Sequence, residues 1–175
     1  MPQDSRTSRK AHRIALAGAC LLVSCAVAQE AAPPELRPAD AHRTIATLHA
    51  SGVQIYVCKR DQGSALAWAF KSPEADLRDD SGNLIARHYA GPTWEAPDGS
   101  KITGKVLRQA ANSRAPDSIA LLLLQATSSG GAGLLAGVHY VQRLNTQGGI
   151  APARACTEEG QESRVSYRAD YVFLE

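Results

Sequence analysis

The chain has 175 residues, of which 44% are hydrophobic and 21% are charged, and its formal net charge is +2. This length is enough for one domain with a hydrophobic core. Residues 1–28 carry four of the 19 basic residues and one of the 17 acidic residues, so their removal leaves 15 basic and 16 acidic residues, a net charge near −1. The positive charge therefore comes from the N-terminal segment, and we expect no nucleic-acid partner.

That segment has the pattern of an export signal. Ten uncharged residues at 14–23, IALAGACLLV, follow four basic residues: Arg6, Arg9, Lys10 and Arg13. They are too few to cross about 30 Å of hydrocarbon as a helix, so we expect no transmembrane span. The sequence AVA at 26–28 predicts cleavage after residue 28 and a periplasmic or secreted protein. The sequence LVSC at 22–25 resembles a bacterial lipobox and predicts instead a lipoprotein anchored to the membrane through Cys25.

Residues 29–41, QEAAPPELRPADA, are rich in alanine, proline and glutamate and lack aromatic residues. This composition predicts a linker, and residues 42–175 are then expected to form a single domain. Within it, residues 44–50 and 53–59 flank Ser51-Gly52, which predicts a hairpin with a two-residue turn. In ALAWAF at 65–70, bulky side chains alternate with alanines, the period of a β-strand.

Further strands are expected along the rest of the chain. Residues 75–78 and 83–89 flank the turn sequence DDSGN, and residues 101–109 alternate again. The apolar run IALLLLQA at 119–126 predicts a strand buried on both faces. Residues 138–144 and the alternating segment 164–175 complete the set. With no amphipathic helix of three turns, about nine short strands predict an all-β fold, an antiparallel sandwich or barrel.

Two cysteines remain once Cys20 and Cys25 are assigned to the export signal. Cys58 and Cys156 form an even pair in a compartment that we expect to be oxidising, which favours one disulfide. The alternative is a pair of buried free thiols.

The stretch HYAGPTWEAPDGS at 88–100 is the segment most crowded with reactive side chains. Its structural interpretation is a corner at Gly91-Pro92 and a turn at residues 97–99, where Pro97 presets φ and Gly99 accepts a positive φ. Trp94 is then a buried plug, and Ser100 lies at an exposed turn. The catalytic candidates of the enzymatic interpretation are His88, Glu95, Asp98 and Ser100, in a triad-like arrangement. No G-x-S-x-G motif surrounds Ser100, which favours the structural interpretation.

No metal or cofactor is expected. A metal site would draw on His42, His49, His88 or His139 together with Glu95 or Asp98, but no two of these histidines have ligand spacing. The Gly-rich segment 128–137 lacks the lysine of a phosphate-binding loop and predicts a mobile connection. The strand tyrosines are either lining residues of a ligand cleft or half-buried sheet residues: Tyr56, Tyr89, Tyr140, Tyr167 and Tyr171.

Several segments together resemble the exported bacterial and fungal family catalogued as domain of unknown function 3455. They are GVQIYVC (52–58), Trp68 followed by Pro73, the ADL…GN…HYAGPTWE…DGS stretch (75–100), IALLLL (119–124), VQRLNTQGGIAP (141–152), Cys156 and YRADYVF (167–173). The family pattern has Pro-Trp where this chain has Ala120-Leu121. The resemblance implies export and supports pairing of Cys58 with Cys156, but it implies no reaction, ligand or catalytic residue.

The leading functional hypothesis is a non-enzymatic domain of the cell envelope that binds a small molecule, a glycan or an envelope protein. The alternative is a hydrolase or metal-dependent enzyme centred on residues 88–100. An enzyme requires its polar groups to converge around a concave pocket, which a structural turn does not.

Overall fold

The structure is a computed structural model that describes Met1 and residues 32–41 and 43–175. The expected export signal, with Cys25 and both processing sites, and His42 lie outside the described residues. The elements are the 3-10 helix η1 (Pro34–Leu36) and the strands β1 (Thr44–Arg60), β2 (Leu66–Arg78), β3 (Leu84–Tyr89), β4 (Thr93–Glu95), β5 (Lys101–Ala110), β6 (Leu121–Gly130), β7 (Tyr140–Gly148) and β8 (Glu162–Leu174). None of the described residues belongs to a helix long and apolar enough to span a membrane.

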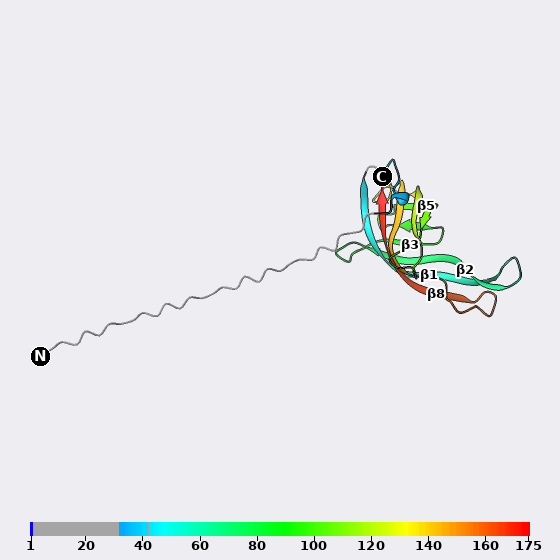
Figure 1. The fold of residues 1–175 in the computed structure, drawn as a ribbon. Helices are drawn as coiled ribbons and strands as arrows, with labels where there is room; N and C mark the ends of the chain where they lie inside the picture. The colour runs from blue at the N-terminus through cyan, green and yellow to red at the C-terminus, as the bar shows by residue number, and fades with distance from the viewer. Residues whose placement is uncertain (2–31, 42) are drawn as a thin grey trace.

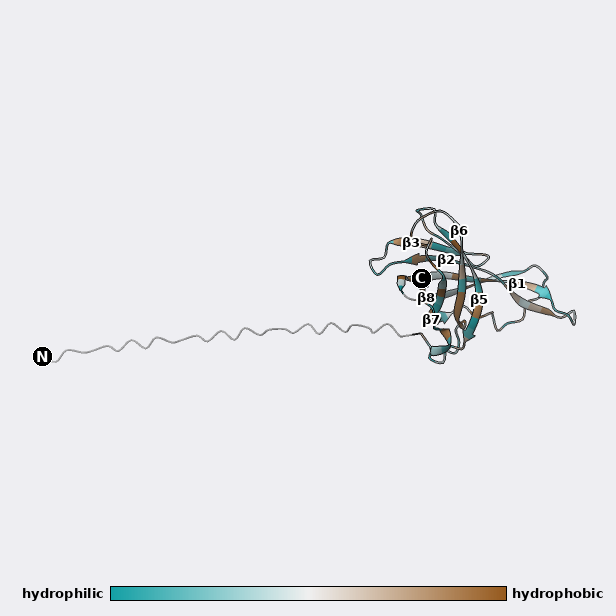
Figure 2. Ribbon diagram, turned by 90° about the horizontal axis from the view of Figure 1, so that it is seen from above, coloured by the Kyte–Doolittle hydropathy of each residue, from teal (hydrophilic) through white to brown (hydrophobic). Residues whose placement is uncertain are grey.

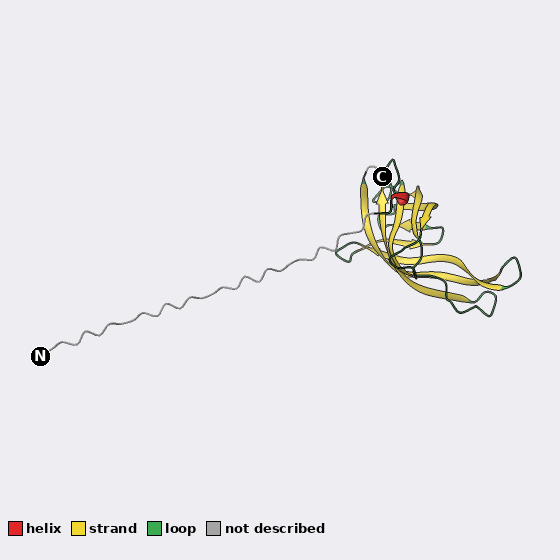
Figure 3. Ribbon diagram, viewed as in Figure 1, coloured by secondary structure: helices red, strands yellow, loops and turns green. Residues whose placement is uncertain are grey.

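The eight strands pair antiparallel in chain order and close on each other through β1 and β8, giving a barrel (Figure 1, Figure 3). The all-β prediction is therefore confirmed, and of its two architectures the barrel is the one observed. Because β1 and β8 pair, the sheet has no free edge strand where it closes into the barrel. The strand number differs by one from the expected nine, because two expected pairs of strands, 44–50 with 53–59 and 65–70 with 75–78, are the continuous strands β1 and β2, and the short strand β4 was not expected.

The hairpin predicted at Ser51-Gly52 is wrong, because β1 continues through both residues as a single strand of 17 residues. Gly52 is required there by a close approach. A Cβ atom on Gly52 would lie 2.1 Å from the carbonyl oxygen of Glu74 and 2.5 Å from the Cα of Ala75 on the paired strand β2. Glycine in this strand marks the contact between two backbones rather than a turn.

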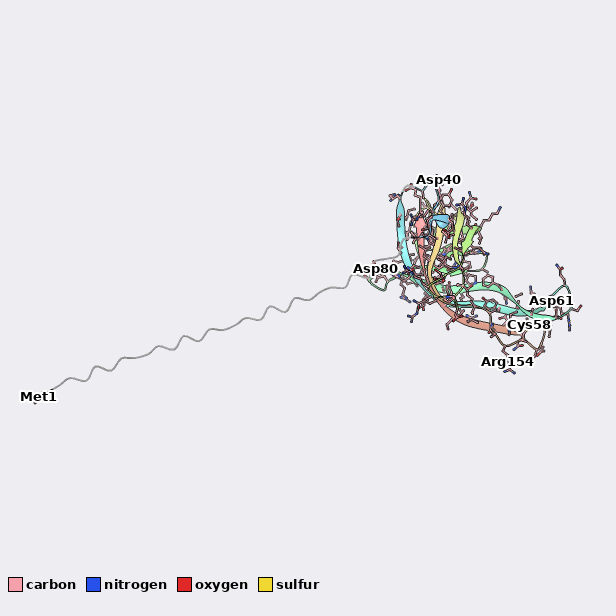
Figure 4. The ribbon with its side chains drawn as sticks, in the orientation of Figure 1. Met1, Asp40, Cys58, Asp61, Asp80 and Arg154 are labelled. Atoms are coloured by element: carbon pink, nitrogen blue, oxygen red, sulfur yellow. A yellow bond between two sulfur atoms is a disulfide. The ribbon has the colours of Figure 1, made fainter. Side chains whose placement is uncertain are left out.

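Three strands extend beyond the barrel as a curved arm (Figure 1). The arm consists of the second half of β1, the first half of β2 and the start of β8. The C-terminal end of β1, in the arm, is hydrophilic (Figure 2). Cys58 and Arg154 lie toward its far end, well away from Asp40 (Figure 4). There Cys58 is bonded to Cys156 with a Cα–Cα distance of 5.8 Å, which confirms the predicted disulfide.

The apolar run of β6 is buried on both faces, as expected. Leu124 is packed in the main core inside the barrel, whereas Leu121 and Leu123 form a second cluster on the outer face with Leu36 of η1. Leu36 is fully buried, so part of the segment expected to be a linker packs on the barrel instead. Burial of Leu36 and hydrogen bonds from Gln142 and Arg108 to the carbonyls of Leu36 and Glu35 hold this segment on the barrel, although its composition is that of a linker.

Candidate functional site

Residues 88–100 form the short hairpin of β3 and β4 and the turn that leads into β5. Gly91 has a φ of +116° at the corner, and Gly99 has a φ of +85° in the next turn, where its N–H donates to the carbonyl of Ala96. Trp94 is fully buried between them and packs edge-on against Tyr171 and Phe173 of β8.

Ser100 is fully buried, whereas the sequence predicted an exposed turn position. Its hydroxyl donates to Asp98 at 2.6 Å and accepts the N–H of Leu135 at 3.0 Å. The other carboxylate oxygen of Asp98 accepts the N–H of Leu134 at 2.8 Å, and this bond is the main cause of the lowered pKa of Asp98. Asp98 and Ser100 thus fasten the Gly-rich connection between β6 and β7, which buries the serine.

The other two candidates make separate contacts. Glu95 accepts a hydrogen bond from the hydroxyl of Tyr89, which lowers the pKa of Glu95, and it pairs with Lys101 at 3.4 Å on the surface. His88 donates from Nδ1 to the carbonyl of Thr93. Among the described residues, no hydrogen bond joins Ser100 to a histidine, and the four candidate side chains belong to three separate groups.

His88 lies inside the barrel rather than at its surface. His88 is only 3% exposed, and its ring stacks on Trp94 with 4.4 Å between centroids. Burial lowers the pKa of His88 to about 4, so the ring is neutral at neutral pH. Because Nδ1 carries the proton given to Thr93, Nε2 is left as an acceptor.

Of the remaining metal candidates, His49 is held between two carboxylates. Its Nδ1 lies 2.7 Å from Asp170 and its Nε2 lies 2.8 Å from Asp80, and hydrogen bonds to these two residues raise the pKa of His49. Within the described part of the chain, no three histidine, cysteine or carboxylate side chains are grouped as metal ligands.

A different concave site lies in the barrel wall, where two long strands are separated by two short ones. Residues 66–74 of β2 pair only with β1, and residues 105–110 of β5 pair only with β6, as far as the described residues go. The hairpin of β3 and β4 ends between them at Gly91-Pro92. We call the resulting gap, bounded by β2, the Gly91-Pro92 corner and β5, the barrel opening.

The barrel opening encloses a cavity of about 280 Å³ that receives at least one residue from every strand. Its lining residues are Gln54, Phe70, Lys71, Ser72, Pro73, His88, Gly91, Pro92, Trp94, Val106, Leu122, Leu124, Arg143 and Tyr171. Phe70 and Val106 form an apolar rim and are 55% and 47% exposed, whereas the floor is buried. The cavity approaches the ordinary range of small-molecule sites, about 300–1,000 Å³.

Polar groups on the floor of the barrel opening lack partners. The Nε1 of Trp94 is buried and has no hydrogen-bond acceptor in the described chain. The Nε2 of Gln54 is also buried and has no acceptor within ordinary hydrogen-bond distance, although the Gln54 side chain lies near enough to Tyr167 to oppose the rise in the pKa of that tyrosine. Arg143 donates from Nε and Nη2 to the carbonyl of Ala120 at 3.1 and 2.8 Å. Buried donors without acceptors are rare in folded proteins, so these groups point to a ligand or to bound water.

Sequence reasoning identified part of this site. His88, Trp94 and Tyr171 were among its candidates, in roles that did not include a shared cavity. Gln54 and Arg143 were missed, although each interrupts an otherwise apolar alternation, in GVQIYVC and in the strand after residue 138. A polar residue on the inward side of a strand was the available signal.

The chain belongs to the family described as protein of unknown function (DUF3455), whose family model matches residues 38–175. No curated protein and no solved structure matches it.

Proposed function

We propose that this member of the family binds a small molecule in the barrel opening and does so without chemical conversion. The single observation that carries the proposal is a cavity to which all eight strands contribute and whose buried floor holds hydrogen-bond donors without acceptors. Small barrels of eight strands are wide enough to hold one small ligand between their side chains.

The composition of the lining supports the same function. Aromatic and aliphatic side chains provide the apolar contact area: Phe70, Trp94, Val106, Leu122 and Leu124. A few polar groups, from Gln54, His88 and Arg143, are placed among them. Apolar walls with a small number of oriented polar groups are typical of ligand pockets.

An enzyme centred on residues 88–100 receives less support. Asp98 and Ser100 have their hydrogen bonds committed to the chain at residues 134 and 135, and Glu95 lies on the surface beside Tyr89. We therefore favour the binding function over the enzymatic one. In this proposal His88 lines the cavity and does not act as a general base.

Binding can be tested with acetophenone, a neutral aromatic molecule with one acceptor. The chain has two tryptophans, and their indole N–H signals in a ¹H–¹⁵N spectrum report on different places. Trp94 lines the barrel opening, whereas Trp68 donates to the carbonyl of Arg154 on the arm. We expect a saturable shift of the Trp94 signal and no shift of the Trp68 signal.

A matched pair of variants locates the site. Val106→Tyr partly fills the barrel opening, whereas Leu107→Tyr changes the next residue of β5, which is 45% exposed and does not line the cavity. The first variant should weaken acetophenone binding several-fold and the second should not. A Trp94 signal that does not move, or an equal effect of both variants, would contradict the proposal.

We also propose that the domain works outside the cytoplasm. The disulfide between Cys58 and Cys156 supports this location, because structural disulfides persist in oxidising compartments. The intact mass of the protein from its native host should correspond to a chain that begins at residue 29 or at a lipidated Cys25. A mature chain that retains residues 1–13 would contradict this localisation.

A further inference from the structure

The two charged side chains that line the barrel opening are both positive. Among the described residues, Arg143 and Lys71 are the only charged residues that line it, and no carboxylate does. Lys71 is exposed at the rim and forms an ion pair with Glu162. Arg143 is half-buried on β7, and among the described residues no carboxylate lies within ion-pairing distance of it. Arg143 is therefore the uncompensated charge of the cavity.

The hydrogen bonds of Arg143 do not neutralise it. Its Nε and Nη2 share one acceptor, the carbonyl of Ala120, which carries no net charge. A guanidinium has five donors in a planar fork, so three are left after these two bonds, and a side-chain hydrogen bond to Tyr171, which lowers the pKa of Tyr171, involves Arg143 as well. The positive charge of Arg143 acts on two side chains that line the same cavity. Burial raises the pKa of Tyr171, and Arg143 opposes this rise. Burial lowers the pKa of His88, and Arg143 lowers it further.

Arg143 also has fixed neighbours that face the same cavity. In the sheet, Arg143 is paired with Leu122 on β6 and with Tyr171 on β8. Tyr171 in turn contacts the stacked rings of His88 and Trp94. His88 is neutral, so it neither repels the guanidinium nor competes for an anion. The unpartnered donors of Gln54 and Trp94 add two further groups that require an acceptor.

We infer that the barrel opening takes a small organic carboxylate with an apolar body, the carboxylate bound by Arg143 and the body held against Trp94 and Leu122. This inference rests on the proposed binding function. A planar carboxylate matches the guanidinium fork and supplies the missing negative charge. A partly buried positive charge without a counter-charge carries a desolvation cost, and a ligand with a negative charge offsets that cost.

The test compares phenylacetate with phenylacetamide, which has the same shape and no charge, on the whole oxidised chain. The Trp94 indole signal provides the dissociation constants. Because charge-assisted hydrogen bonds are about twice as strong as neutral ones, phenylacetate should bind at least about tenfold more tightly. Added salt should weaken binding of phenylacetate and leave that of phenylacetamide unchanged.

Arg143→Gln should remove the difference between the two probes, and Arg143→Lys should keep part of it. Arg168→Gln, a change of the same charge on the outer side of the neighbouring strand β8, should leave it intact. Melting curves show whether each variant is folded, and the comparison of probes on the unchanged chain does not depend on them.

Equal binding of both probes at Trp94 would overturn the carboxylate inference and leave the proposed binding function standing. If phenylacetate, phenylacetamide and acetophenone all fail to shift the Trp94 signal, both are overturned. If Arg143→Gln still prefers phenylacetate, another group binds the carboxylate, and the role proposed for Arg143 is overturned.

Discussion

At the scale of single residues, some side chains of the segment 88–100 stabilise the fold and others line the cavity. Ser100 shows the first role, because its buried hydroxyl accepts the N–H of Leu135. Ser100→Ala should cost about 1–3 kcal/mol of unfolding free energy, since it leaves a buried donor without an acceptor. Urea unfolding measures this cost, and amide hydrogen exchange should accelerate at Leu135. Ser81→Ala, at an exposed turn position, is the control and should cost less than about 0.5 kcal/mol. Unchanged exchange at Leu135 would contradict the role assigned to Ser100.

His88 has the second role and makes stability depend on pH. Its folded pKa is about 4, below the unfolded value of about 6.5, so the unfolded chain binds more protons between these values. Stability should therefore fall by roughly 3 kcal/mol as the pH drops from 6.5 to 4. His88→Phe keeps an aromatic ring against Trp94 and should remove this part of the slope in urea titrations at several pH values.

His49 offers a control because its pKa is shifted in the opposite direction. Its folded pKa is raised by hydrogen bonds to Asp80 and Asp170, so its contribution is complete below pH 6.5 and is lost as the pH rises through the folded pKa. His49→Asn should lower stability by a constant amount below pH 6.5 and change the slope of the profile only above pH 6.5. A His88→Phe profile parallel to that of the unchanged chain would show that His88 is not buried as a neutral ring.

At the scale of elements, Gly52 holds β1 and β2 at their closest approach. Gly52→Ala places a Cβ against the backbone of residues 74 and 75, which cannot move without breaking strand pairing. We expect destabilisation of at least about 1–3 kcal/mol in urea unfolding. Gly63→Ala, where the nearest atom would be 3.4 Å away in an exposed loop, should change stability little. Equal costs for the two substitutions would indicate that β1 and β2 are spaced more widely.

The same elements show what sequence patterns predict and what they miss. Alternation and turn residues predicted most strands, and the apolar run of β6 correctly indicated burial on two faces. Gly52 was misread, because a glycine required by a close interstrand contact looks the same in sequence as a glycine required by a turn. The barrel opening was not predicted either, since it depends on β3 and β4 being shorter than the strands beside them. Strand length is poorly marked in a sequence whose turns are flanked by further β-forming residues.

At the scale of the whole molecule, the chain combines a barrel that holds the cavity with an arm that the disulfide fastens. Cys58 lies on β1 and Cys156 in the connection between β7 and β8, 98 residues apart in sequence. The backbone of Cys58 also accepts the N–H of Gly160 and donates to the carbonyl of Gln161. The disulfide therefore fastens this connection to the arm and, through β1 and β8, links the two ends of the domain.

Reduction of this disulfide should lower the unfolding free energy by about 2–5 kcal/mol, because the unfolded chain regains the entropy of a long closed loop. Cys58→Ser/Cys156→Ser tests the same effect without reductant, and urea unfolding measures it. In the folded variant we expect the Trp68 indole signal to shift, since its acceptor Arg154 lies two residues from Cys156, and we expect trypsin to cleave faster at Arg154. The Trp94 signal and its response to acetophenone should persist, because the barrel opening receives no residue from this connection. Loss of the Trp94 response together with the disulfide would show instead that the arm and the cavity form one cooperative unit.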